Sequence, residues 1–416
     1  MYEGKIIKFY REKQKLTQEQ LGKDICSTTH ISKIECAQTT YATEITNLLC
    51  ERLEINMEEE LTKLANIKQK LLYWQETIIM QLYNEMDQIN SELEHEELLE
   101  ISKYAYMYQL LRARYLLMYN KSNEAFKILK KIQRKLNRLS PYETNLLKHT
   151  FGIYYLENQD YISSIQSFKS IQITIYNNPE YYYHLAVAYH TTQSRMLAYY
   201  YAEKAHQYFK NINNYLRVID AEMLMLIQVK DDFSSDEEII KRFKNLIKSC
   251  ELCNAVDRKA RVLHNLAVEY LRRSNYELAS IYYKESMSIK DQVSNSYLLS
   301  LEGYIRSSLE GRLLPKNELI LLAENGFTIA KNMNSLLYIH LFKLLIYLLK
   351  CKEKEYHQYL VEKALPMFNK NGFYYLIERS NKELFNFYST MRLTDQAMEI
   401  AKLLIKNSYN ENSPTR

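Results

Sequence analysis

The sequence predicts an all-α protein in which a small N-terminal helical bundle precedes a long array of helix hairpins. Three observations support this fold class. The chain of 416 residues has seven glycines and five prolines, which are too few for the tight turns that join strands. Two short helices with capping residues can be read near the N-terminus. Further along, a pattern of large and small residues recurs every 34 to 44 residues, which indicates repeated units.

The composition is that of a folded protein with two or three domains. Hydrophobic residues make up 47% of the chain and charged residues 25%, which is ordinary for a globular protein. The net charge of +5 does not by itself indicate nucleic acid. The six cysteines are scattered and no apolar leader precedes them, so we expect reduced thiols and a cytoplasmic location. The most apolar stretch, Leu336–Leu349, contains charged Lys343 and is too short to span a membrane.

The N-terminal bundle is predicted around a helix-turn-helix. Thr17 can cap its first helix, and Gln20, three residues later, completes a capping box. Ser27 can cap the second helix, and Ile31 and Ile34 then face the first helix. The polar residues of the second helix are left on its outward face, which is the face that a recognition helix turns to the major groove.

The outward residues, with Gln18 at the start of the first helix, are candidates for contacts to phosphates and base edges. These candidates are Gln18, Ser27, Thr28, Thr29, His30 and Lys33. The alternative is that the N-terminal bundle, here called the head (residues 1–57), serves folding or dimer contacts alone. Residues 1–57 carry eight basic and eight acidic side chains. Because phosphate neutralisation supplies most of the affinity for DNA, an isolated head should bind weakly and need a dimer.

Three segments are predicted, with boundaries at 1–57, 58–94 and 95–416. The middle segment reads as one continuous helix, because its apolar residues from Leu61 to Met86 follow steps of three or four. This pattern is consistent with a linker helix, a dimer seam, or the first helices of the next domain.

The last segment repeats itself. In several places a large apolar residue precedes a small one by 13 positions, as in Leu185 and Ala198, or Leu266 and Ala279. The second-helix positions of the repeat are Ala125, Ser164, Ala198, Ala279, Ala323, His357 and Ala397. The gap of 81 residues after Ala198 requires one degenerate repeat, around residues 211–253. About eight hairpins result.

This pattern resembles the tetratricopeptide repeat, a helix hairpin of about 34 residues. The resemblance implies a right-handed superhelix with a concave groove. An irregular α-helical bundle is the alternative.

A lambda-repressor-like helix-turn-helix followed by such repeats resembles the Rap/Rgg/NprR/PlcR family of peptide-sensing regulators of Gram-positive bacteria. The segments that carry the resemblance are Leu16–Leu21, Ile25–Ser27 and Ile31–Glu35, and they are most similar to the NprR and PlcR branches. The resemblance implies a cytoplasmic receptor whose superhelix binds a short signalling peptide. It also implies a homodimer that places two heads on operator DNA. The chain departs from the family at Cys36-Ala37, where relatives commonly carry a basic residue and a glycine.

The groove candidates follow from the repeat frame. Asn265 is expected to face the groove, where its amide can donate to and accept from an extended peptide unit, and it also resembles the peptide-holding asparagine of the family. Its alternative role is a bond to a neighbouring helix end. The other candidates are Arg261, Arg272, Arg114, Tyr183, His190, Arg379, Lys382 and Asn386. Several cations with few acids predict a ligand with a carboxylate. The alternative is a solvated surface.

No motif indicates a metal, a cofactor or catalysis. Cys250 and Cys253 form a single Cys-x-x-Cys inside a predicted helix, without a second pair that could complete a zinc site. Phosphate-binding glycine loops, HExxH and nucleophile-elbow motifs are absent from the sequence. We therefore predict no cofactor and no enzymatic activity.

A second function remains open. In the Rap branch, the resemblance implies an interaction protein that docks on a phosphorelay response regulator, with little or no DNA binding. Residues 58–140 would be its docking surface, with Gln75, Gln81 or Gln88 placed near the aspartyl phosphate. The neutral charge of the head favours this alternative.

Overall fold

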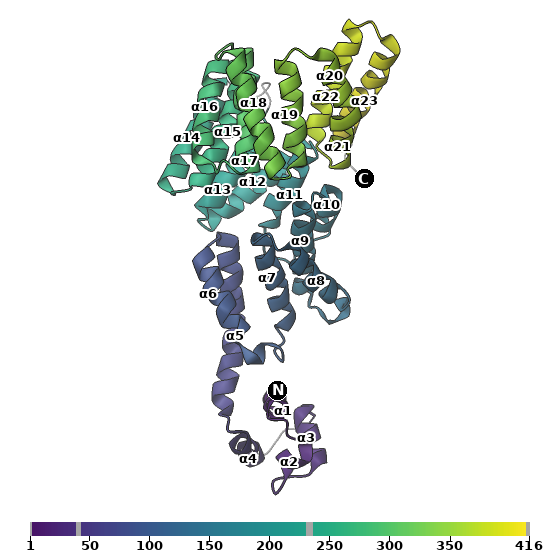
Figure 1. Ribbon diagram of the computed structural model, residues 1–416. Coiled ribbons are helices and arrows are strands. Elements are labelled where there is room, and N and C mark those ends of the chain that lie inside the picture. Colours follow the sequence, from purple (N-terminus) through teal and green to yellow (C-terminus); the bar gives the residue numbers. More distant parts are fainter. Residues whose placement is uncertain (1, 39–42, 230–235, 413–416) are drawn as a thin grey trace. The chain divides into compact units, whose positions relative to one another are not determined.

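The computed structural model describes residues 2–38, 43–229 and 236–412, and every regular element in these ranges is a helix. The helices divide into two compact units (Figure 1). The first comprises Met1–Tyr154 with Ser170–Asn177, and the second comprises Tyr155–Lys169 with Asn178–Arg416. None of the described helices has the length and apolar character needed to cross a membrane.

The first unit begins with the predicted helical head. Its helices are α1 (Glu3–Lys13), α2 (Gln18–Gly22), α3 (Thr28–Glu35) and α4 (Thr43–Leu53). The predicted caps are confirmed, since Thr17 and Gln20 form the capping box of α2 and Ser27 caps α3. Ile31 and Ile34 are fully buried against Leu21, as the apolar spacing predicts. The helix-turn-helix is therefore α2 and α3.

The turn after α3 places an alanine in a left-handed conformation. Ala37 has a φ of 56°, a left-handed conformation that costs a residue with a Cβ about 1 kcal/mol. We expect Ala37→Gly to stabilise the head by about 0.5–1 kcal/mol, measured as slower hydrogen exchange of the α1–α3 amides. The same substitution in the exposed middle of α5, Ala65→Gly, should instead destabilise its helix by about 1 kcal/mol. Faster exchange in the Ala37 variant would contradict this account of the turn.

The segment 58–94 is two helices, so the prediction of one continuous helix is wrong. They are α5 (Met57–Met80) and α6 (Tyr83–Glu94), separated at Gln81, which has a φ of 60°. Helix α6 folds back on α5, and the indole N–H of Trp74 donates to the carbonyl of Met86 at 3.1 Å. The return buries apolar residues of both helices against each other, among them Ile78 and Ile89. A single straight helix would leave these apolar side chains exposed to water.

The rest of the first unit contains the first repeat helices. They are η1 (Glu97–Leu99), α7 (Ala105–Met118), α8 (Ser122–Gln133), η2 (Leu136–Arg138) and most of α9 (Pro141–Glu157). Ala125, the small residue predicted for the second helix, is fully buried in α8. Helix α7 packs against both α5 and α8.

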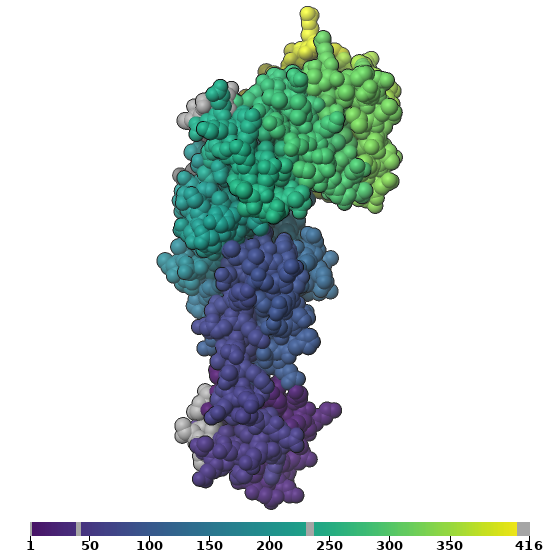
Figure 2. All heavy atoms as spheres, turned by 90° about the vertical axis from the view of Figure 1, so that its left-hand side faces the viewer, coloured from purple at the N-terminus to yellow at the C-terminus, as the bar shows by residue number. Residues whose placement is uncertain are grey.

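The second unit is a series of helix hairpins, and Figure 2 shows its atoms as one continuous packed body in teal to yellow. Its helices are α10 (Tyr161–Lys169), α11 (Tyr181–Thr191), α12 (Arg195–Asn211), α13 (Tyr215–Leu226), α14 (Asp236–Leu252), α15 (Val256–Arg272), α16 (Tyr276–Ile289), α17 (Asn295–Glu310), α18 (Lys316–Asn332), α19 (Leu336–Leu349), α20 (Glu353–Tyr359), η3 (Leu360–Ala364), α21 (Leu365–Lys370), α22 (Tyr374–Thr390) and α23 (Thr394–Asn412).

The predicted repeats are confirmed. In chain order, the described helices from α7 onward form eight successive pairs when α20, η3 and α21 are counted as one helix, and the degenerate pair is α13 with α14. Residues 230–235, within that predicted repeat, lie outside the described residues. Ala198, Ala279 and Ala323 are fully buried where paired helices approach each other. His357, at the same second-helix position of its repeat, differs because its ring stacks on Phe387 with centroids 3.6 Å apart.

Candidate functional site

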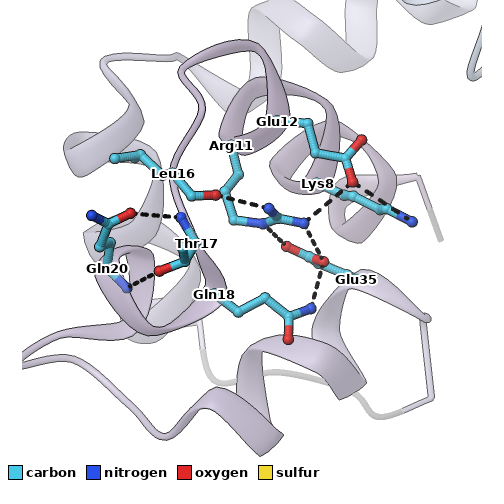
Figure 3. A network of polar contacts seen from close by, with 8 residues as sticks. All are labelled: Lys8, Arg11, Glu12, Leu16, Thr17, Gln18, Gln20 and Glu35. Atoms are coloured by element: carbon cyan, nitrogen blue, oxygen red, sulfur yellow. Dashed lines mark hydrogen bonds and ion pairs between the residues drawn. The ribbon is translucent and has the colours of Figure 1, made fainter.

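A buried ion pair ties the first three helices of the head together (Figure 3). Arg11 of α1 donates to both carboxylate oxygens of Glu35 at the end of α3, at 2.5 and 3.0 Å. It also donates to the carbonyl of Leu16 at 2.9 Å. Glu35 is 7% exposed, and pairing with it raises the pKa of Arg11. The network fixes α3 relative to α1.

The same carboxylate holds Gln18, the first candidate for a phosphate contact. The Gln18 amide nitrogen donates to Glu35 at 2.9 Å, and Figure 3 shows the side chain crossing from α2 to the end of α3. One of the two amide hydrogens is used in this bond, so the second is the one left for a phosphate.

The outward face of α3 is polar, as the sequence predicts. Thr28, Thr29 and Lys33 are exposed, and His30 is half-buried. The exposed Ser27 accepts the backbone N–H of His30 as the helix cap, so its hydroxyl hydrogen remains the group that can donate. Threonine, histidine and lysine side chains can all reach base edges or phosphates from a helix in the major groove.

Of the groove candidates, Arg114 is not where the sequence places it. It lies on α7 in the first unit and is 3% exposed. Arg114 is therefore withdrawn from solvent, contrary to the expectation that it is exposed on a groove. The remaining groove candidates all lie in the second unit.

Asn265 has an unused amide. It is half-buried in the middle of α15 and has no hydrogen-bond partner in the part of the chain that the structure describes. Arg261 lies four residues earlier and so on the same face of the helix. The alternative role for Asn265, a bond to a neighbouring helix end, does not occur among the described residues.

Arg261 belongs to a group of three arginines around one buried carboxylate, which we call the arginine cluster (Arg217, Arg258 and Arg261 around Asp220). Arg258 binds Asp220 through two nitrogens at 2.9 and 3.1 Å. Arg261 donates to the same carboxylate at 2.8 Å, although its side chain is 45% exposed. Arg217 lies 3.8 Å from Asp220 and 3.8 Å from the fully buried Glu180.

Tyr183 and His190, both on α11, are half-buried. The Arg217 guanidinium lies over the Tyr183 ring, 4.8 Å from its centroid. Gln228 donates its amide to His190 Nδ1 at 2.9 Å. Burial lowers the pKa of His190, so its imidazole is neutral at pH 7 and acts here as an acceptor.

The other predicted cations are paired. Arg272 binds Glu269 at 2.7 Å, Lys382 binds Glu378, and Arg379 lies 3.1 Å from Glu383. The expectation of several cations with few acids is therefore wrong. Side chains that are far apart in the sequence, or one turn apart on a helix, supply the missing carboxylates.

Asn386 is exposed on α22 and lines a cavity of about 630 Å³. The wall around it is partly apolar, with Phe387 and Met391, and partly charged, with Arg306 and Glu383. The cavity can hold a side chain of mixed character next to the Asn386 amide.

The Cys-x-x-Cys pair is a packing element. Cys250 is buried in the core of the second unit. Burial raises the pKa of the Cys250 thiol to about 11. A thiol in this state is a poor nucleophile and a poor metal ligand.

Sequence reasoning missed a polar group around His264, the residue before Asn265 in α15. Lys290, at the end of α16, donates to the buried hydroxyl of Ser300 at 2.6 Å, and that hydroxyl lies 3.0 Å from His264 Nδ1. The three residues come from three different helices or helix ends. No spacing rule within one helix could have joined them.

No family model matches the chain. A curated transcriptional activator, NprA of Geobacillus stearothermophilus, is 21% identical over 413 residues, covering 93% of this chain and 99% of the relative. The solved structure of NprR with its cognate peptide NprX has a TM-score of 0.67 at 19% identity, covering 82% of this chain and 98% of that one. A Rap protein complexed with Competence and Sporulation Factor has a TM-score of 0.70 at 13% identity, covering 84% and 99%. These matches confirm the predicted resemblance, so the chain is similar to the Rap/Rgg/NprR/PlcR group of peptide-sensing regulators along most of its length.

Proposed function

We propose that this protein is a cytoplasmic transcriptional regulator, controlled by a short signalling peptide that binds among the repeats of the second unit. It binds operator DNA as a homodimer through α3. The observation that carries this proposal is the exposed polar face of α3, held by the Glu35 ion pair in a capped helix-turn-helix. The similarity to a protein named as a transcriptional activator supports it.

The peptide part of the proposal rests on Asn265. Its amide is half-buried and unpaired among the described residues, and such an amide can bind one peptide unit of an extended ligand through both a donor and an acceptor. The similar NprR structure contains a bound peptide, which supports a peptide as the ligand class here. We propose that Asn386 and its neighbouring cavity receive part of the same ligand.

DNA binding is tested with the double variant Thr29→Ala/Lys33→Ala in the full-length protein. The variant removes one exposed hydroxyl and one exposed ammonium from α3. We expect affinity for a protected site to fall on the order of 30-fold or more, because a base contact contributes about 1–3 kcal/mol and a phosphate contact adds to it. Footprinting across the DNA next to the protein's own gene, at low and moderate salt, measures the effect.

The matched control is Thr62→Ala/Lys68→Ala, which makes the same two changes on exposed positions of α5, outside the head. Its footprint should equal that of the wild type. A wild-type protein that protects no site at low salt, alone or with peptides that it binds, would refute the DNA-binding proposal.

The second candidate function is docking on a response regulator, which the balanced charge of the head favours. Its three candidate glutamines differ in their surroundings. Gln75 is 7% exposed and its amide is bonded to the Tyr142 hydroxyl, so it is withdrawn from the surface. Gln81 follows the end of α5 and has a left-handed backbone conformation. Gln88 is exposed on α6, and its amide donates to Glu92. An unchanged phosphoryl lifetime on candidate response regulators would exclude this function.

A further inference from the structure

Lys290 is a partly buried cation without a counter-charge. Its ammonium donates to Ser300 at 2.6 Å, and no carboxylate of the described residues lies within ion-pair distance of it. An ammonium has three hydrogens to donate, so two find no acceptor among the described residues. Placing a charge away from water without a partner is unfavourable. A negatively charged ligand would relieve this cost.

The groups that fix Lys290 are uncharged. Ser300 is fully buried; its oxygen accepts from Lys290 and lies 3.0 Å from His264 Nδ1 and 3.3 Å from the hydroxyl of Ser286. Burial and the charge of Lys290 lower the pKa of His264 to about 3, so the imidazole is neutral. The network therefore orients the ammonium and leaves its charge uncompensated.

The arginine cluster increases the local positive charge. Arg261 is close enough to contribute to the lowered pKa of Lys290. The three arginines are paired with two carboxylates, Asp220 and Glu180, so Lys290 brings the count to four positive and two negative charges. Two positive charges are in excess. The Ser300 hydroxyl links Lys290 to His264 of α15, and Arg261 lies one turn before His264 and Asn265 on the same helix.

We propose that Lys290 and Arg261 form an anion subsite that binds a carboxylate of the peptide, while Asn265 binds the adjacent backbone. The inference rests on the peptide-controlled function proposed above. The carboxylate belongs to the C-terminus of the peptide or to an acidic side chain, and both would accept the ammonium and guanidinium hydrogens. In the free protein, Arg261 is bound by Asp220, so the ligand carboxylate competes with an internal one.

The subsite has an expected pH dependence. Burial and Arg261 lower the pKa of Lys290 to about 8, and a bound carboxylate would raise it again. Affinity should therefore be constant below pH 7 and fall as pH rises through 8, where binding requires uptake of a proton. The other groups here are Arg261 and His264 on α15 and Glu302 on α17, which is paired with Arg306. Across pH 7 to 9, Arg261 stays charged and His264 stays neutral.

The test uses the full-length protein and two pools of randomised synthetic heptapeptides, one with a free C-terminal carboxyl group and one with a C-terminal amide. Peptides that co-elute with the protein are identified by mass spectrometry, resynthesised and titrated. Retention in the free-acid pool alone assigns the C-terminal carboxylate. An acidic residue enriched at one position in both pools assigns a side chain.

The decisive variant is Lys290→Gln, which keeps a donor for Ser300 and removes the charge. We expect the retained peptides to bind it about 10- to 100-fold more weakly. The matched control is Lys284→Gln, the same change at an exposed position of α16, and it should bind like the wild type. Lys290→Arg restores the charge and should recover most of the affinity.

The outcomes separate two failures. If Lys290→Gln binds the retained peptides like the wild type, the subsite is wrong while peptide control stands. If the wild type retains no peptide from either pool, peptide control is wrong and the subsite with it. The melting temperature of Lys290→Gln should equal or exceed that of the wild type, because the variant removes an unpaired charge.

Discussion

The Glu35→Ala variant is expected to destabilise the head by about 3–5 kcal/mol, the usual cost of removing one partner of a buried ion pair. Glu35 is 7% exposed and the Arg11 side chain is 11% exposed, so the change leaves Arg11 partly buried without its counter-charge. Gln18 loses its acceptor as well. Hydrogen exchange of the α1–α3 amides, read by mass spectrometry on the full chain, should accelerate strongly. The footprint on DNA should disappear under the same conditions.

Glu12→Ala is the matched control for that variant. Glu12 also lies within ion-pair distance of Arg11, at 3.4 Å, but its side chain is 57% exposed. An exposed pair of this kind contributes about 0–1 kcal/mol. Similar exchange rates in the two variants would show that Glu35 does not hold the head together.

Local rules were sufficient to predict the head and the hairpins. The caps at Thr17 and Ser27 depend on residues at most three positions away. The repeat depends on the 13-residue interval between a large and a small residue, because that interval places the two on facing helices of one hairpin. Ala198 and Ala279 are buried for this reason. Such patterns are short enough to read along the chain.

The break at Gln81 could not be predicted in the same way. The apolar steps of three and four continue across it, so the pattern fits either one helix or two. What decides is tertiary packing, in which the Trp74 indole reaches the backbone of Met86 after the chain has turned back. The local sequence does not show how strongly the packing of α6 on α5 favours a break at Gln81.

In the candidate site, too, the features that depend on local spacing were predictable and the contacts between distant residues were not. Exposure on α3 follows from helical periodicity, and it was predicted correctly for Thr28, Thr29 and Lys33. Charge pairing does not follow from it, since Asp220 and Arg261 are 41 positions apart. Lys290 lies outside the helix that carries Asn265, so no helical face could include both.

The Asp220→Asn variant is expected to have the largest effect in the second unit. Asp220 is 2% exposed and is the shared acceptor of the arginine cluster. Its neutralisation leaves Arg258 and Arg217 partly buried with Glu180 as the nearby carboxylate. We expect a loss of about 3 kcal/mol, at the low end of the range for a broken buried pair, because Arg261 is 45% exposed and can turn to water. Faster hydrogen exchange of the α13 and α15 amides measures it.

The same variant tests whether Asp220 competes with the ligand. Without its internal partner Arg261 is available to a peptide carboxylate, so the peptides retained by the wild type should bind Asp220→Asn more tightly, provided that the second unit remains folded at the temperature of the titration. Asp257→Asn, an exposed change in the first turn of α15, should alter neither stability nor affinity beyond about 0.5 kcal/mol. Weaker peptide binding in Asp220→Asn would show instead that Asp220 positions Arg261 for the ligand. Unchanged exchange would show that the arginines are held by their other contacts, such as the Arg217 stack on Tyr183.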